Sequence, residues 1–91
     1  MIRREGQRLL LDGPVTAATH VELRERARAL FDADDLIFDW TKVDAVDSSA
    51  LALILHWRRY AAAHGQQVSQ ANLPAGVTAL AELYGVSELL A

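Results

Sequence analysis

Two segments with the period of an amphipathic helix lie on either side of a short apolar run, and this alternation restricts the possible folds most strongly. In the first, apolar or half-polar side chains recur at helical spacing, at His20, Leu23, Ala27 and Leu30. The apolar run, residues 36–40, has the length of a strand. The second helix is predicted over residues 48–64 and ends before Gly65. Strand–helix–strand units connect parallel strands by right-handed crossovers, so a parallel arrangement is predicted around residues 36–40.

The remaining segments complete one small domain. Residues 2–5 and 8–11 are predicted to form a hairpin that turns at Gly6, and Asp12-Gly13-Pro14 is expected to end its second strand. Residues 41–47 are read as a loop and residues 68–73 as an edge strand. A third helix is expected to start at Pro74, with a buried stripe of Val77, Leu80 and Leu83, and a short final turn to start at Ser87. The order ββαβαβα predicts a single α/β domain over residues 1–91, with a small, mixed, mostly parallel four-stranded sheet, three main helices and a short C-terminal helix.

Composition and charge exclude several classes of function. The 91 residues are 52% hydrophobic and carry a net charge of −3, which fits a folded domain and argues against binding to nucleic acid. The absence of cysteine excludes a thiolate zinc site and a cysteine nucleophile. Neither common glycine-rich phosphate loop is present, and three scattered histidines, His20, His56 and His64, lack metal-ligand spacing. We therefore expect a protein that is not an enzyme and that holds no cofactor or metal.

The apolar runs are short. Only three leucines follow the basic N-terminal segment, which is fewer than a signal peptide needs. The longest run, residues 50–55, is far below the roughly 20 residues of a membrane span. We therefore expect a cytoplasmic protein with no direct membrane insertion.

A short polar segment, Asp47-Ser48-Ser49, separates the apolar residue at the end of the preceding segment from a very apolar helix. Asp and Ser are preferred helix N-caps, because their oxygens accept hydrogen bonds from free backbone N–H groups. A hydroxyl at this place also lies at the positive end of the helix dipole, where a phosphate or an acidic group of a partner is stabilised. The segment Asp47-Ser48-Ser49 is therefore both a predicted N-cap of the second helix and a candidate binding site.

The helix predicted over residues 48–64 is apolar on all sides in its first two turns. Only His56 interrupts residues 50–57. Two alternatives follow: the other helices cover the surplus apolar side, or Leu53 and Trp57 lie partly open as a protein-binding patch. We predict that Trp57 belongs to an interface; the alternative is that it packs under the third helix.

With these residues in view, the sequence resembles the STAS family, the sulphate transporter and anti-sigma factor antagonist domain. The resemblance covers nearly the whole chain and rests on Leu11-Asp12-Gly13, the strand at residues 36–40, the D-S-S-x-L motif at residues 47–51 and the C-terminal helices. Within the family the chain is most similar to the small cytoplasmic subunit of Mla-type phospholipid ABC transporters. Residues 46–56, VDSSALALILH, and residues 80–86, LAELYGV, carry that closer similarity.

The resemblance implies a regulatory or assembly subunit that is not an enzyme. Its expected partner is the ATPase subunit of a phospholipid ABC transporter, and through it the permease complex, at the inner membrane. The alternative is an anti-sigma factor antagonist that is switched by phosphorylation of Ser48. Nucleotide binding by the domain itself is a third alternative, and the formation of a homodimer is left open.

The resemblance also implies the positions of the site residues. Ser48 corresponds to the hydroxyl that is phosphorylated in antagonists and that contacts the ATPase in transporters. Ala50 replaces the usual glycine and adds a Cβ where a partner is expected, and Thr16 is expected beside Ser48. The predicted partner-binding residues are Asp47, Ser48, Ser49, Ala50, Leu51, Thr16 and Trp57.

Overall fold

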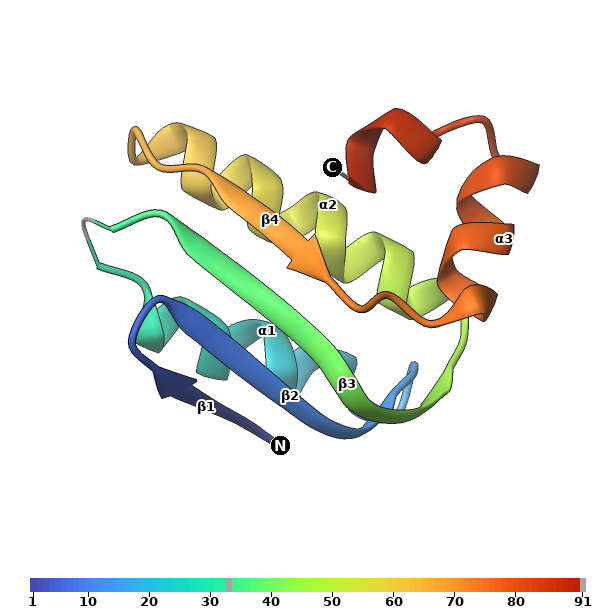
Figure 1. Ribbon diagram of the computed structural model, residues 1–91, viewed down its shortest axis with the longest axis horizontal. Coiled ribbons are helices and arrows are strands. Elements are labelled where there is room, and N and C mark those ends of the chain that lie inside the picture. Colours follow the sequence, from blue (N-terminus) through green and yellow to red (C-terminus); the bar gives the residue numbers. More distant parts are fainter. Residues whose placement is uncertain (33, 91) are drawn as a thin grey trace.

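A four-stranded mixed sheet organises the computed structural model, which describes residues 1–32 and 34–90 (Figure 1). The elements are β1 (Ile2–Glu5), β2 (Arg8–Val15), α1 (His20–Leu30), β3 (Leu36–Val46), α2 (Ser48–Ala63), β4 (Val68–Ala71), α3 (Ala75–Leu83) and the 3-10 helix η1 (Ser87–Leu90). The strands lie in the order β1-β2-β3-β4. The predicted order of elements is confirmed.

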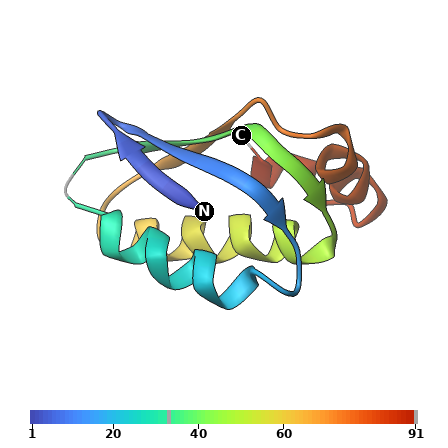
Figure 2. The ribbon, with the colours of Figure 1, turned by 90° about the horizontal axis from the view of Figure 1, so that it is seen from below.

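The pairing of the strands is also as predicted. β1 and β2 form the antiparallel hairpin, whereas β2–β3 and β3–β4 are parallel pairs. The two crossover helices, α1 and α2, lie side by side on one face of the sheet, so the other face stays open (Figure 2). α3 and η1 lie beside α2 at the end of the molecule where α2 begins (Figure 1). β4 is an edge strand, as its weak alternation indicated.

The hydrophobic core lies between the sheet and the helices. Apolar side chains on one face of each strand meet the apolar stripes of the helices, in accordance with the two-residue and 3.6-residue periods of the sequence. The fully buried large side chains are Leu9, Leu11, Val15, Leu36, Phe38, Trp40, Leu53, Ile54, Trp57 and Val77. No helix in the described residues has the length and hydropathy that a membrane crossing requires.

Two strands are longer than the sequence indicated. β2 does not end at residues 12–14 but continues through Gly13 and Pro14 to Val15, and β3 continues to Val46 where a loop was expected. Parallel pairing between the two strands persists to their ends, with register irregularities after Leu10 and Gly13. Gly13 accommodates the irregularity because its φ of 83° lies in the left-handed region. Turn-like residues were therefore wrongly read as strand ends.

The expected interface tryptophan is a core residue. Trp57 is 0% exposed, and its ring stacks on Phe38 of β3 with a centroid distance of 4.1 Å and an interplanar angle of 7°. Leu53 is equally buried. The prediction of an apolar patch at these two residues is wrong. Trp57 is a core residue, as the alternative expected, and the packing partner that the structure shows for its ring is Phe38 of the sheet.

Two local predictions about the helices are corrected as well. Leu83 was placed in the buried stripe of α3 but is 75% exposed, whereas Val77 and Ala81 form that stripe. The sequence, with Thr19 three residues before Glu22, predicts a capping box at the start of α1. Thr19 is the N-cap of α1, but its side chain makes no capping hydrogen bond, so this prediction is wrong. The Thr19 hydroxyl instead holds the loop that precedes α1.

Candidate partner-binding site at the start of helix α2

The candidate site forms where β2 and β3 end side by side. Val15 and Val46, the last residues of the two parallel strands, are paired with each other. The carboxyl ends of parallel strands meet at one edge of a sheet, where the loops that leave them converge. The loop from Thr16 to Thr19 therefore meets the junction between β3 and α2, as the resemblance implied for Thr16 and Ser48.

The carboxylate of Asp47 joins these two segments. Its Oδ1 accepts a hydrogen bond from the backbone N–H of Ser49 at 2.8 Å, which caps α2. Its Oδ2 accepts a second hydrogen bond from the backbone N–H of Ala17 at 3.0 Å, in the loop before α1. These hydrogen bonds, first the one from Ala17 and then the one from Ser49, hold the pKa of Asp47 below its usual value. The junction thus contains a carboxylate that stays ionised at neutral pH.

The Thr19 hydroxyl holds the facing loop. It donates a hydrogen bond to the carbonyl oxygen of Pro14 at 2.9 Å and accepts one from the backbone N–H of Thr16 at 3.1 Å. The loop is thereby closed over the end of β2 and connected to α2 through Asp47. Both sides of the site are fixed by hydrogen bonds within the chain.

Exposure divides the predicted residues into two groups. Ser48 is exposed, and Asp47, Ser49 and Thr16 are half-buried at the surface. Among the described residues, none forms a hydrogen bond with the Ser48 hydroxyl. The structure thus leaves Ser48 accessible at the head of a helix whose start is held in place.

The other three predicted contacts lie inside the chain. Ala50 and Trp57 are 0% exposed and Leu51 is 6% exposed. Ala50 and Trp57 lie on the side of α2 that packs on the sheet, so the prediction that they contact a partner is wrong. Leu51 is also buried, so the same prediction is wrong for Leu51. The Cβ of Ala50 therefore does not meet a partner at this surface.

Helix α3 is a part of the site that the sequence analysis did not include. It lies close to the junction, since a Cβ placed on Gly76 would come within 3.1 Å of Cγ2 of Val46. Its outer side is exposed and uncharged at Ala75, Gly76 and Ala79, and Leu83 and Tyr84 beyond them are 75% and 58% exposed. The sequence signal was present, because no Asp, Glu, Lys or Arg occurs between Arg59 and Glu82. A helix whose first seven residues carry no charge, with Glu82 near its C-terminal end, and with little of its surface buried fits a contact surface.

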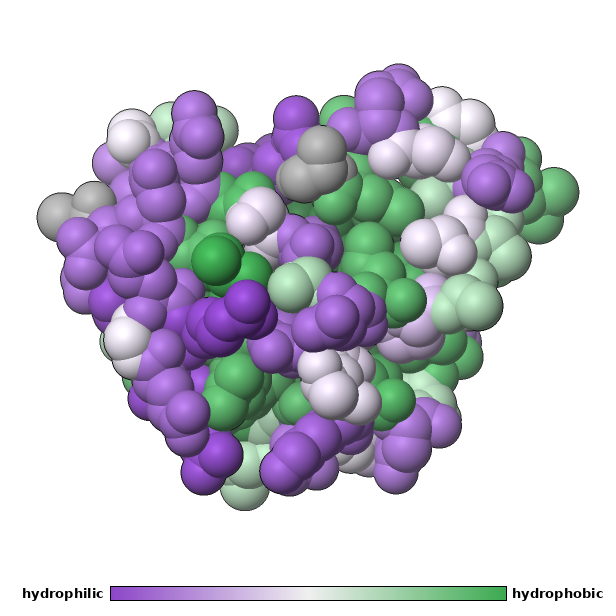
Figure 3. Space-filling model, viewed as in Figure 1, coloured by the Kyte–Doolittle hydropathy of each residue, from purple (hydrophilic) through white to green (hydrophobic). Residues whose placement is uncertain are grey.

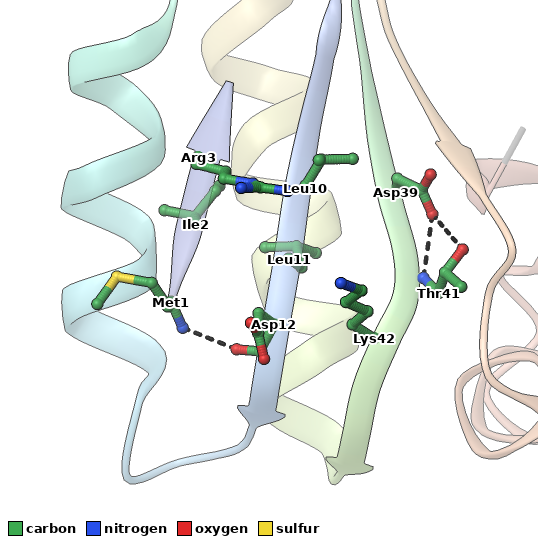
Figure 4. A pocket seen from close by; sticks show the side chains of 9 residues that line it. All are labelled: Met1, Ile2, Arg3, Leu10, Leu11, Asp12, Asp39, Thr41 and Lys42. Atoms are coloured by element: carbon green, nitrogen blue, oxygen red, sulfur yellow. Dashed lines mark hydrogen bonds between the residues drawn. The ribbon is translucent and has the colours of Figure 1, made fainter. Parts of the chain in front are cut away.

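The open face of the sheet carries a second region of interest, a hollow of about 600 Å³ across β1, β2 and β3 (Figure 4). Its lining is Met1, Ile2, Arg3, Leu10, Leu11, Asp12, Asp39, Thr41 and Lys42. The N-terminal amino group donates to the carbonyl oxygen of Asp12 at 2.7 Å, and Asp39 pairs with Arg8 at 3.0 Å. Hydrophilic side chains cover much of this face, whereas hydrophobic ones gather toward α3 and η1 (Figure 3). The apolar surface thus lies nearer to the junction than to the hollow.

The histidines do not form a metal site in the described part of the chain. No group of three or more His, Asp or Glu side chains there has the arrangement that a metal ion needs. His20 lies on α1, and His56 and His64 lie in and after α2.

Comparisons with solved structures identify the fold. The anti-sigma factor antagonist SpoIIAA in its unphosphorylated form superposes with a TM-score of 0.68 at 16% identity, covering 91% of this chain and 81% of that one. Mglu superposes with a TM-score of 0.60 at 22% identity over 82% of this chain. The murine anion transporter Slc26a9, solute carrier 26 family member A9, in its inward-facing state gives 0.58 at 21% identity over 89% of this chain. This chain spans only 19% of Mglu and 13% of Slc26a9.

A search of curated proteins gave no match. A family model described as "Mlab, STAS domain" matches residues 1–91, the whole chain. The motif at residues 47–51, the mixed sheet with its two crossover helices, and the similarity to an antagonist fold agree with this match. The chain therefore belongs to the Mlab-type STAS domain family.

Proposed function

We propose that the chain is a regulatory or assembly subunit, without enzymatic activity, that binds the ATPase subunit of a phospholipid ABC transporter. The observation that carries this proposal is the exposed Ser48 on a junction held by Asp47, beside the exposed, uncharged residues Ala75, Gly76 and Ala79 of α3. The match to the Mlab-type model supports the transporter branch of the family. In this proposal the protein lies at the inner membrane through its partner.

The combination of rigidity and exposure favours protein binding. The Asp47 and Thr19 hydrogen bonds fix the backbone around Ser48, so little conformational entropy is lost when a partner binds there. The exposed Leu83 and Tyr84 provide apolar and aromatic area of the kind that is enriched in interface cores. We place Ser48, Ala75, Gly76, Ala79, Leu83 and Tyr84 in one partner surface.

The alternative function is a switch in which a kinase phosphorylates Ser48. The accessible hydroxyl favours it, and a phosphate beside the ionised Asp47 would repel an acidic partner surface. The replacement of glycine by Ala50 does not oppose it, because the Ala50 side chain lies in the core. Incubation with the candidate kinase and mass spectrometry of Ser48 test this alternative directly.

Coexpression with the ATPase subunit of a phospholipid ABC transporter from the same organism tests the main proposal. We expect a stable complex on size-exclusion chromatography and its loss in Ser48→Arg, because a long charged side chain would enter the interface. Gln7→Arg is the matched control, since Gln7 is exposed in the β1–β2 turn at the opposite end of β2. Complex formation by Ser48→Arg at the wild-type yield would remove this surface from the interface.

A further inference from the structure

Gly76 on α3 differs from the other four glycines of the chain. Those four each have a φ between 61° and 83°, in the left-handed region that favours glycine: Gly6, Gly13, Gly65 and Gly85. At none of them would an added Cβ lie within 4 Å of a described atom outside the two neighbouring residues. Gly76 has no positive φ, but its added Cβ would lie 3.1 Å from Cγ2 of Val46. Space beside Val46, rather than backbone conformation, is therefore the reason for glycine at position 76.

The close approach of α3 to Val46 leaves too little room for a side chain at position 76. Two carbon atoms in contact are most stable about 3.5–4.0 Å apart, so a methyl carbon at 3.1 Å would crowd the valine. Val46 is half-buried and packs against the hydrophobic core, and its branched side chain has few rotamers. A methyl group at position 76 would therefore move α3 and the end of β3 apart by a few tenths of an ångström.

The contact between Gly76 and Val46 connects α3 to the candidate site. Val46 is the last residue of β3, and Asp47 and Ser48 follow it directly. On the side of α3, Gly76 precedes Val77, which is 0% exposed in the core. Because α3 lies beside the start of α2 (Figure 1), the position of its exposed side relative to Ser48 depends on how closely Gly76 lies against Val46.

Other roles of glycine do not account for Gly76. Glycine is less favourable than alanine in a helix, because it loses more conformational entropy on folding. Gly76 does not cap α3, since Pro74 is the N-cap and Gly76 is the second helical residue. It is also exposed and has no side chain to bury. The close approach of α3 to β3 is therefore what the structure gains from glycine at this position.

We propose that Gly76 is a positioning residue, which sets α3 against the junction between β3 and α2 so that Ser48 and the exposed residues of α3 form one rigid partner surface. This inference rests on the proposed function and adds the residue that keeps the two parts of the surface in place. With a methyl group at position 76, the free chain relaxes to a slightly wider arrangement. The partner must then press α3 back against Val46, and the cost of that crowding appears in the Kd.

Binding of the ATPase subunit to Gly76→Ala, measured by titration calorimetry, tests the inference. We expect the Kd to rise about tenfold, since crowding by one methyl group in a packed contact has an effect of this order. The melting temperature should change by less than about 4 °C, because the higher helix propensity of alanine offsets part of the crowding.

Gly65→Ala is the matched control. Gly65 follows α2 at the end away from Ser48, and its φ of 69° is unfavourable for alanine. This variant should lose about 4–8 °C in melting temperature and keep the Kd of the wild type. The two glycine variants thus separate an effect on binding from an effect on stability.

A double variant shows whether Gly76 acts through Val46. A methyl group on the exposed Gly76 has a second way to weaken binding, which is direct contact with the partner. Val46→Ala removes the Cγ2 atom that the new methyl group meets. The Kd of Gly76→Ala/Val46→Ala should therefore lie within about twofold of the Kd of Val46→Ala alone. A double variant that binds as weakly as Gly76→Ala would overturn the positioning role.

The outcomes separate the two proposals. If the wild-type chain binds and Gly76→Ala binds equally well, the positioning role is refuted while the proposed function stands. If the wild-type chain does not bind the ATPase subunit at all, both are refuted. Should Gly76→Ala fold poorly, the comparison of the double variant with Val46→Ala decides, and a clearly higher Kd for the double variant contradicts the inference.

Discussion

A single carboxylate connects the two chain segments that form the candidate site. Asp47 accepts one hydrogen bond from the helix it caps and one from the loop before α1. An isolated N-cap would need only the first of these. The second ties α1 and α2 together at their N-terminal ends, so the geometry around Ser48 depends on one residue.

We expect Asp47→Asn to lower the melting temperature by about 3–10 °C, because the neutral amide keeps only one acceptor oxygen. The amide protons of Ala17 and Ser49 should exchange faster than in the wild-type chain, as both lose an ionised acceptor. Thermal melts and hydrogen exchange measure the two effects. Asp44→Asn, at an exposed position of β3, is the control and should change neither.

The burial of Trp57 leads to a prediction about folding. Trp57→Ala should lower the free energy of unfolding by about 3–5 kcal/mol, since it removes a fully buried ring that stacks on Phe38. Urea unfolding of the isolated domain measures the loss. Leu83→Ala, at an exposed position of α3, should change it by less than about 0.5 kcal/mol. A small loss for Trp57→Ala would contradict the packing described for this residue.

The sequence could not decide the position of Trp57. The first turns of α2 are apolar on every side, so the helical period defines no unique buried stripe. Burial was decided by the neighbours: the sheet on one side, with α1 and α3 on the others. By contrast, Asp47 and Ser48 were found from local rules alone, because capping depends on neighbouring residues in the sequence.

At the level of elements, order and pairing were predictable and strand lengths were not. The two helical periods and the apolar run at residues 36–40 were enough to predict parallel crossovers. The ends of β2 and β3 were missed because polar and turn-forming residues such as Asp12 and Asp44 are tolerated on an open sheet face. α3 was placed correctly, but the absence of charged residues from its first two turns was not recognised as a feature of a contact surface.

The irregularity in β2 supports a prediction about Gly13. Gly13→Ala should lower the free energy of unfolding by about 1–2 kcal/mol, because its φ of 83° is unfavourable for a residue with a Cβ. Apart from the two neighbouring residues, no described atom lies within 4 Å of the added Cβ, so the backbone conformation alone causes the loss. Gly13→Asn is the comparison, since asparagine tolerates the left-handed region better and should lose less. Equal stability of the alanine variant in urea unfolding would show that the local backbone relaxes.

The molecule as a whole has two different faces. One face carries the helices (Figure 2) and the other, open face carries a charged network centred on Asp39. The carboxylate of Asp39 accepts hydrogen bonds from the hydroxyl of Thr41 at 2.6 Å and from Asn72 at 3.1 Å, and it pairs with Arg8 at 3.0 Å. These partners lie on β2, on β3 and after β4. Three parts of the sheet are therefore joined on the side that no helix covers.

The network predicts how stability depends on pH. Hydrogen bonds from Thr41 and Asn72, together with the charge of Arg8, lower the pKa of Asp39 from 3.8 to about 2. A carboxyl whose pKa is lower in the folded chain stabilises that chain above its unfolded pKa, and this contribution is lost as the pH falls from about 4 to about 2. The loss should be about 1–2 kcal/mol, allowing for the partial exposure of the side chain.

Urea unfolding of the wild type and of Asp39→Asn between pH 2 and pH 7 measures this contribution. We expect the variant to be less stable at pH 7 and its stability to fall less steeply below pH 4, because the titrating group is gone while the amide keeps part of the hydrogen bonding. Asp12→Asn is the control on the same open face, where the Asp12 side chain forms no hydrogen bond within the described residues. Parallel pH profiles for the wild type and Asp39→Asn would mean that Asp39 does not link the sheet in solution. Because the network lies on the face away from Ser48, binding of the ATPase subunit at pH 7 should be the same for Asp39→Asn and the wild type.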